Sequence, residues 1–184
     1  MNVPLLMVGL GNPGNEYAAT RHNIGFRVID AYVLKNDSPL RSKRETSLAE
    51  ITMGNDRIYA MKPHSFMNTS GEAVSSFMRY YKIPPSRLIV VHDDLDLGFG
   101  KIKIAFDRGD AGHQGVASII ATLGSKAFHR LRIGIGSNRP LGMLSEDYVL
   151  QNFSNEEEET LTTRVIPEAV EHLRALERKL VKTE

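Results

Sequence analysis

The sequence predicts an α/β protein, with one domain over residues 1–184 and a mixed, mostly parallel central sheet that carries helices on both faces. Strand-like and helix-like segments alternate along the chain, which is typical of parallel strands connected by helices. Several strand-like segments are short, unbroken apolar runs, as expected where both faces of a sheet are covered. A hairpin pattern in the first half makes the sheet mixed instead of wholly parallel.

The first half of the chain contains three expected strands and two expected helices. The first strand is an apolar run that ends in a glycine-rich turn. Apolar residues at helical spacing indicate both helices, and Pro84-Pro85 ends the second. Gly54-Asn55-Asp56 separates the other two strands, as in a hairpin. The strands are expected at 5–8, 48–53 and 58–61, and the helices at 24–33 and 73–81.

The second half continues the alternation. Lysine and isoleucine alternate over 101–104, which is the pattern of a half-exposed strand. Ser154 and Glu157 have the spacing of a capping box before a helical stripe. Because Pro167 falls inside that stripe, we expect a kink or two helices instead of one rod. The strands are expected at 88–91, 101–104 and 131–135, and the helices at 116–123 and 161–180.

The composition is that of an ordinary soluble domain. The chain has 184 residues, 41% of them hydrophobic and 24% charged. It has no cysteine, which excludes disulfides and thiolate metal sites and fits a reducing cytoplasm. The apolar run over 5–10 is too short to span a membrane and lacks signal-peptide flanks. We therefore expect a cytoplasmic monomer with no membrane, cofactor or obligate protein partner.

The net charge of +1 does not by itself suggest a nucleic-acid partner. Any RNA contact must therefore come from local clusters of basic residues. The first cluster is typical of a solvated surface, whereas the other two lie beside candidate site residues. The clusters are Arg41-Ser42-Lys43-Arg44, then Lys101 with Lys103 and Arg108, then Arg130 with Arg132.

The glycine-rich turn over 9–14 matches the dinucleotide fingerprint G-x-G-x-x-G, but its surroundings argue against that function. Pro13 removes a backbone N–H that would face a pyrophosphate, and the next helical stripe begins only after His22-Asn23. Asp30, the carboxylate at the ribose-binding distance, lies within a helical pattern. The turn is better suited to presenting the amide of Asn12 to a ligand.

Six ordered segments together resemble the bacterial peptidyl-tRNA hydrolase family. Each segment alone is weakly specific, whereas the ordered set, which runs from Val8 to about Gly136, is very specific. The segments are Tyr17 with Thr20-Arg21-His22-Asn23, Phe66-Met67-Asn68-Thr69-Ser70-Gly71, His92-Asp93-Asp94-Leu95-Asp96-Leu97, Lys101-Ile102-Lys103, Gly112-His113-Gln114-Gly115, and Arg130-Leu131-Arg132-Ile133-Gly134-Ile135-Gly136.

The resemblance implies a metal-independent esterase that releases tRNA from peptidyl-tRNA, which would be its partner. It implies His22 as the catalytic base and Asp93 as its partner, with Asn12 in the catalytic group. It also implies a substrate-binding and tRNA-binding set, with phosphate-facing charge from the basic members. That set is Tyr17, Phe66, Met67, Asn68, His113, Gln114, Lys101, Lys103 and Arg132.

The residue types fit ester hydrolysis by water. A neutral imidazole with a pKa of about 6.5 is the best general base available. Asp93 would accept the other ring N–H and stabilise the imidazolium, as in the Asp–His half of a triad with water in place of serine. Asn12 and Asn68 could hold the peptide, stabilise an oxyanion or position water.

Structural alternatives exist for several of these residues. Asn12 suits a turn and Asn68 a helix cap. Phe66 and Met67 could equally belong to the core, and Tyr17 could stack on a base or simply pack.

The run from His92 to Asp96 invites a metal site, because carboxylates and imidazoles suit divalent ions. In an extended segment, however, Asp93 and Asp94 point to opposite faces. We therefore expect no metal, and surface or capping roles for Asp94 and Asp96. A metal-dependent phosphoesterase is the rival enzyme class, which a chelator would reveal. A non-catalytic RNA-binding module is the rival outside enzymology, which a turnover assay would separate.

Two departures from the family pattern affect the RNA contacts more than the ester chemistry. Gln114 stands where the family usually has Asn, so its amide reaches one methylene further. The preceding stretch, 106–111, is less glycine-rich than usual. Asp107 and Asp110 place negative charge near the expected RNA path.

Overall fold

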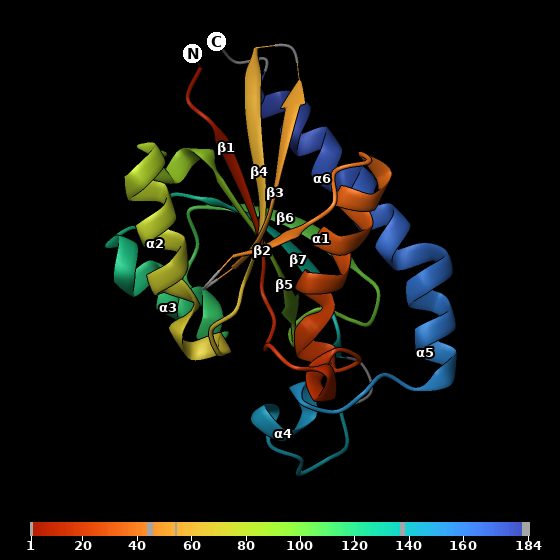
Figure 1. Cartoon of the computed structure of the whole chain (residues 1–184). Helices are drawn as coiled ribbons and strands as arrows, with labels where there is room; N and C mark the ends of the chain where they lie inside the picture. The colour runs from red at the N-terminus through yellow and green to blue at the C-terminus, as the bar shows by residue number, and fades with distance from the viewer. Residues whose placement is uncertain (1, 44–45, 54, 137–138, 182–184) are drawn as a thin grey trace.

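The computed structural model describes residues 2–43, 46–53, 55–136 and 139–181. Within these residues, seven strands form one sheet in the order β2-β3-β4-β1-β5-β7-β6 (Figure 1). The strands are β1 Leu5–Gly9, β2 Arg41–Lys43, β3 Thr46–Met53, β4 Asp56–Pro63, β5 Leu88–Asp94, β6 Ile102–Phe106 and β7 His129–Gly134.

The four central strands are parallel and the outer strands are antiparallel. β1 pairs in parallel with β4 and β5, and β5 pairs in parallel with β7. β3 pairs antiparallel with β4 and with β2 on one side, and β6 pairs antiparallel with β7 on the other. The predicted mixed sheet and the predicted hairpin strands are therefore confirmed, although Gly54 of the expected hairpin turn lies outside the described residues.

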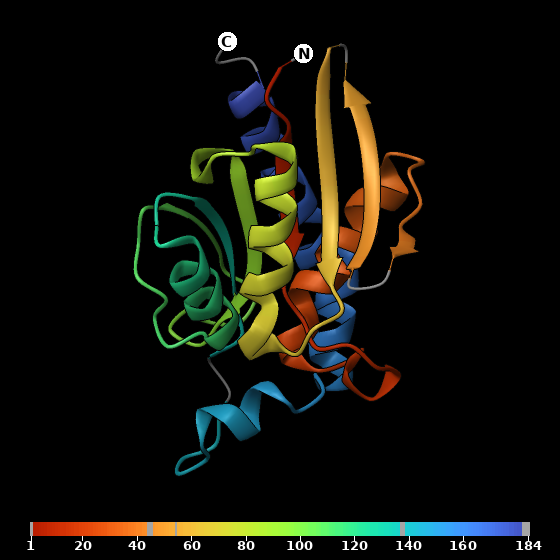
Figure 2. The ribbon, with the colours of Figure 1, turned by 60° about the vertical axis from the view of Figure 1, so that its left-hand side comes forward.

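Helices cover both faces of the sheet, as the sequence predicts (Figure 2). Alternate residues of β1 enter two separate cores, because side chains of a strand point to opposite faces. Leu5 and Met7 pack with α1 and α6, whereas Leu6 and Val8 pack with α2 and α3. The main helices are α1 Ile24–Lys35, α2 Ser70–Tyr81, α3 Gln114–Leu123 and α6 Ile166–Val181.

The C-terminal segment bears out both of its sequence signals. Ser154 and Glu157 form a complete capping box at the start of α5, Asn155–Thr160. A π-helical turn, Leu161–Val165, then connects α5 to α6. Pro167 is the second residue of α6, where its missing N–H costs little. The stripe therefore runs through the π-helical turn into α6, so the C-terminal segment is not one regular rod, as expected.

Two short elements were not predicted. β2 has only three residues, and part of the basic cluster around it, Arg44, lies outside the described residues. α4, Ser145–Val149, is a five-residue helix away from the main layers (Figure 2). Within the described residues, no helix combines the length and apolar character that crossing a membrane requires.

The functional side chains gather at the carboxyl ends of the parallel strands. The turn after β1 and the last residues of β5 meet there, and a 3₁₀ turn, Arg21–Asn23, leads into α1. α1 approaches the sheet closely, because Gly25 has no side chain. A Cβ on Gly25 would lie 2.3 Å from the carbonyl oxygen of Val91 and 2.6 Å from the backbone nitrogen of Leu10.

Gly25→Ala should destabilise the fold by about 1–3 kcal/mol, because neighbouring backbone cannot move aside as a flexible side chain would. Urea unfolding measures the change. Gly109→Ala is the matched control, since nothing lies within 4 Å of its added Cβ. Gly109→Ala should change the free energy of unfolding by no more than about 1 kcal/mol. Equal effects of the two substitutions would contradict the close-approach argument.

Candidate active site

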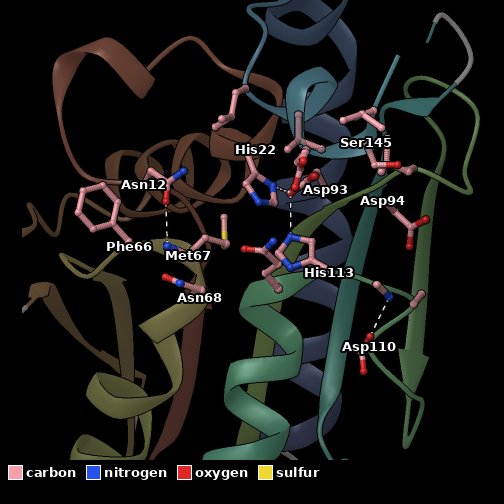
Figure 3. Close-up of a pocket in the computed structure, with 18 of the residues that line it drawn as sticks. Asn12, His22, Phe66, Met67, Asn68, Asp93, Asp94, Asp110, His113 and Ser145 are labelled. Carbon is pink, nitrogen blue, oxygen red and sulfur yellow. Dashed lines mark hydrogen bonds and ion pairs between the residues drawn. The ribbon is translucent and has the colours of Figure 1, made fainter. Parts of the chain in front are cut away.

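A cleft of about 790 Å³ opens at this edge of the sheet (Figure 3). Nine of the twelve site residues expected from the sequence line it. Lys101, Lys103 and Arg132 lie outside it. The nine are Asn12, Tyr17, His22, Phe66, Met67, Asn68, Asp93, His113 and Gln114.

Asp93 is the centre of the hydrogen-bond network in the cleft. Its side chain is buried at the end of β5. Oδ1 of Asp93 lies 2.9 Å from Nδ1 of His22 and 2.9 Å from Nε2 of His113 (Figure 3). One carboxylate oxygen therefore holds two imidazoles, whose ring centroids are 4.8 Å apart.

The tautomer of His113 follows from its place at the start of α3. Its Nδ1 accepts hydrogen bonds from the backbone N–H groups of Gly115, at 3.1 Å, and Val116, at 3.3 Å. Nε2 of His113 must therefore carry the proton that it donates to Asp93. His22 donates from Nδ1, which leaves its Nε2 free as an acceptor in the cleft.

Asp93 controls the ionisation of His22. Burial alone lowers the pKa of His22, but the negative charge of Asp93 and its hydrogen bond outweigh burial and raise the pKa above its ordinary value. Burial alone would raise the pKa of Asp93, whereas His22 and His113 lower it far below its ordinary range. Asp93 is therefore ionised throughout the working range of pH, and its charge holds the pKa of His22 above the ordinary value.

His92 is a buried neighbour of this network. Its ring meets that of His113 edge-on, with centroids 4.7 Å apart. Burial and the neighbouring His113 lower the pKa of His92 well below its ordinary value. His92 is therefore neutral and packs behind His113.

The donor atoms of His22, Asp93 and His113 lie within 4.8 Å of one another, a spacing that raises the question of a metal site. The hydrogen bonds at His113 do not fit one. Its Nδ1 lone pair faces two backbone N–H groups, so its Nε2 carries a proton and offers no lone pair. The described residues fit a hydrogen-bonded Asp–His network better than a metal centre.

The divergence of Asp93 and Asp94 is confirmed, but a surface role for Asp94 is wrong. Asp94 is 5% exposed, and its Oδ2 pairs with Nε of Arg132 at 2.6 Å. Its Oδ1 accepts a hydrogen bond from the backbone N–H of Asp96, whose side chain is exposed. The expectation for Asp94 was a surface or capping role, because a sequence pattern does not reveal a cross-strand cation 38 residues away.

The amide of Asn12 is held in one orientation. Oδ1 of Asn12 accepts the backbone N–H of Met67 at 2.8 Å, so Nδ2 faces the cleft as a donor (Figure 3). Asn23 fixes the backbone of Asn12 by accepting its N–H and donating to its carbonyl oxygen, each at 2.9 Å. Asn23 was not proposed as a site residue, although it directly follows His22.

The remaining lining residues form the floor and rim of the cleft. Met67 is buried and belongs to the core as well as the cleft. Phe66 is 58% exposed, and its ring meets that of Tyr17 edge-on at 6.5 Å. Asn68 is exposed, and the cap of α2 is Thr69, so the alternative role of Asn68 as a helix cap is wrong. Gln114, the first residue of α3, is exposed.

The expected basic face lies beside the cleft. Lys103 is directly opposite Arg132 in the β6–β7 pair, so the two side chains share a face. Lys101 and Lys103 are exposed, whereas Arg132 is paired with Asp94. Arg130 is buried, and its guanidinium donates to the carbonyl oxygen of Gly109 at 2.6 Å. Arg130 therefore supports the 107–112 loop and is not available to RNA.

One wall of the cleft was missed by the sequence argument. It comes from α4 and its flanks, where Leu144 and Leu150 are large apolar side chains left 60% and 45% exposed. The segment is too short to show a periodic apolar stripe, so the sequence does not indicate a helix here. The wall residues are Leu144, Ser145, Glu146, Val149 and Leu150.

Comparison with known proteins decides the family. The family model described as peptidyl-tRNA hydrolase matches residues 6–184. The chain belongs to the peptidyl-tRNA hydrolase family. The predicted membership is therefore confirmed, and the match extends into the tail that the sequence motifs covered only loosely.

Similar proteins and structures agree with this assignment. A peptidyl-tRNA hydrolase of Wolinella succinogenes is 46% identical over 91% of this chain and 84% of its own length. One from Chloroflexus aurantiacus is 48% identical over 85% of this chain and 84% of its own length. The crystal structure of peptidyl-tRNA hydrolase from Acinetobacter baumannii has a TM-score of 0.81 and 32% identity, covering 94% of this chain and 85% of that one.

Asp93→Asn should lower the pKa of His22 below the ordinary value of a histidine, because it removes the charge that raises the pKa and leaves burial, which lowers it. An NMR titration of the His22 ring measures the change directly. Asp96→Asn is the control, since Asp96 is exposed and not part of the network. An unchanged His22 midpoint in Asp93→Asn would show that Asp93 does not set this pKa.

Proposed function

We propose that this chain hydrolyses the ester bond between peptide and tRNA, with His22 as the general base for water. One observation carries the proposal: Nδ1 of His22 donates to the buried carboxylate of Asp93 at 2.9 Å. That bond leaves Nε2 of His22 as the free acceptor in the cleft. Membership of the peptidyl-tRNA hydrolase family supplies the substrate class.

The reaction needs one proton acceptor that later becomes a proton donor. Nε2 of His22 takes a proton from water while the hydroxyl oxygen adds to the ester carbonyl. Asp93 stabilises the resulting imidazolium. When the tetrahedral intermediate collapses, the carbon–oxygen bond to the ribose breaks and the imidazolium returns the proton to the ribose oxygen. The products are tRNA with a free hydroxyl and a peptide carboxylic acid, which loses its remaining proton to solvent to become the carboxylate.

His113 completes the orientation of the base. It donates to the same oxygen of Asp93 as His22, and its other ring nitrogen is fixed by the start of α3. The carboxylate therefore has one position from which it can hold His22. Because a charged acceptor in a buried site forms strong hydrogen bonds, this arrangement favours a single rotamer of the base.

Asn12 suits the developing oxyanion. Its Nδ2 is a donor in the same cleft, and its orientation is imposed by Met67 and Asn23. A donor held in place before the reaction stabilises developing charge without reorganisation. We assign Asn68 and Gln114, both exposed on the rim, to the peptide and tRNA end, and Phe66 and Tyr17 to stacking with bases.

The phosphates of the tRNA would lie along the face of Lys101, Lys103 and Arg132. Lys103 and Arg132 are cross-strand neighbours, so their charges add at one place. Asp94 neutralises part of the charge of Arg132, which leaves the two exposed lysines as the principal cations. A local cluster of this kind can bind RNA although the whole chain carries a net charge of only +1.

The two rival functions are less well supported. A metal-dependent phosphoesterase would need the His92–Asp96 run to converge, but Asp94 turns away from Asp93 and pairs with Arg132. A purely RNA-binding module would not require a buried Asp–His network with a free ring nitrogen in a cleft.

His22→Ala should lower turnover of peptidyl-tRNA by about 10²–10⁴-fold, because it removes the general base. Binding of tRNA should change little, since His22 is not one of the cations proposed to contact the phosphates. His172→Ala is the control, because His172 is a half-exposed histidine on α6. A folded His22→Ala protein that turns over substrate at the parent rate would end the assignment.

Lys103→Ala should weaken tRNA binding, because one phosphate contact is lost. The slope of log binding constant against log salt concentration should become shallower by about one unit. Hydrolysis of a minimal ester lacking most of the RNA should be unaffected. The matched control is Lys126→Ala, an exposed lysine that precedes β7 at the opposite end of the sheet. If plots of log binding constant against log salt concentration coincide for the parent and Lys103→Ala, then this face does not contact the RNA.

A further inference from the structure

Arg21, the residue before His22, lies at a buried junction that the proposed chemistry does not use. Its guanidinium forms two hydrogen bonds with the carboxylate of Glu157, at 3.0 and 2.8 Å. Arg21 and Glu157 are both only 6% exposed, although 136 residues separate them. A buried ion pair is costly to desolvate and gives little net stability, so stability alone does not account for the presence of this pair.

The surroundings of Arg21 connect it to the α4 wall of the cleft. Its guanidinium lies 4.5 Å from the ring centroid of Tyr148, on α4, and 4.9 Å from that of Phe153, before α5. The hydroxyl of Tyr148 donates to the carbonyl oxygen of Ile135 at 2.9 Å. Arg21 is thus enclosed by α4 and by the segment that follows it.

The backbone makes the same connection. The N–H of Arg21 donates to the carbonyl oxygen of Gln151 at 2.9 Å, and Thr20 forms an isolated bridge with Asn152. Glu157 also accepts the backbone N–H of Ser154 at 2.8 Å. The turn that carries His22 and the segment after α4 therefore meet at one fully hydrogen-bonded carboxylate.

We propose that Arg21 is a positioning residue that fixes the α4 wall relative to His22, so that the peptide is held at a set distance from the base. The wall offers Leu144, Val149 and Leu150 to apolar peptide side chains. Ser145 of this wall lies on the opposite side of the cleft from Phe66 (Figure 3). This inference rests on the proposed ester hydrolysis. It predicts that loss of the junction harms substrates that reach the wall and spares substrates that do not.

The test compares two esters on the same RNA end: a short apolar peptide and a single N-acetylated amino acid. The double variant Arg21→Met with Glu157→Gln removes both charges together, because either one alone would remain buried and unpaired. KM for the peptidyl ester should rise about tenfold, on the scale of a small misplacement of a bound group. Turnover of the single-residue ester and the pH profile of either ester should not change, because the bond between His22 and Asp93 is intact.

The matched control is Arg27→Met with Glu158→Gln, a neighbouring ion pair that joins α1 to α5. The control should leave the ratio of KM values unchanged. Tyr148→Leu is a second variant, which keeps the ion pair and loses the contact between Arg21 and α4. It should also raise KM for the peptidyl ester, and it serves as the test if the double variant does not fold. An equal rise in KM for both esters, or a ratio of the two KM values no different from that of the control, would overturn the positioning role. Failure of the parent to hydrolyse either ester would instead overturn the proposed function.

Discussion

The sharing of one Asp93 oxygen by two imidazole N–H groups is the interaction on which the rest of the site depends. The carboxylate is buried at the end of β5, so it needs strong donors, and His22 and His113 provide them. The same two bonds keep Asp93 ionised and leave Nε2 of His22 free for the cleft. The chemistry and the burial of the network are therefore consequences of one geometry.

The fold supplies that geometry by bringing three loop regions to one edge of the sheet. β5 delivers Asp93, the start of α3 delivers His113, and the turn before α1 delivers His22. The close approach of α1 at Gly25 and the bonds between Asn12 and Asn23 hold the turns against each other.

Most of the fold and much of the site could be predicted because periodic apolar patterns and local motifs carry that information. The alternation of the sheet, the capping box at Ser154 and the divergence of Asp93 from Asp94 depend on neighbours in sequence. The pairing of Arg132 with Asp94, the α4 wall and the junction of Arg21 with Glu157 depend on contacts between distant segments. A pattern of residue types indicates the faces of an element but not which distant side chain will meet it.

The pH dependence of kcat/KM for the unaltered enzyme, measured beside an NMR titration of His22, tests the central claim most directly. A base must be neutral to accept a proton, so activity should rise with pH through the pKa of His22 in the free enzyme. Because Asp93 raises that pKa, the kinetic and NMR midpoints should coincide, above the ordinary pKa of a histidine. A kinetic midpoint that differs from the His22 midpoint, or activity that is flat through that range, would contradict the account.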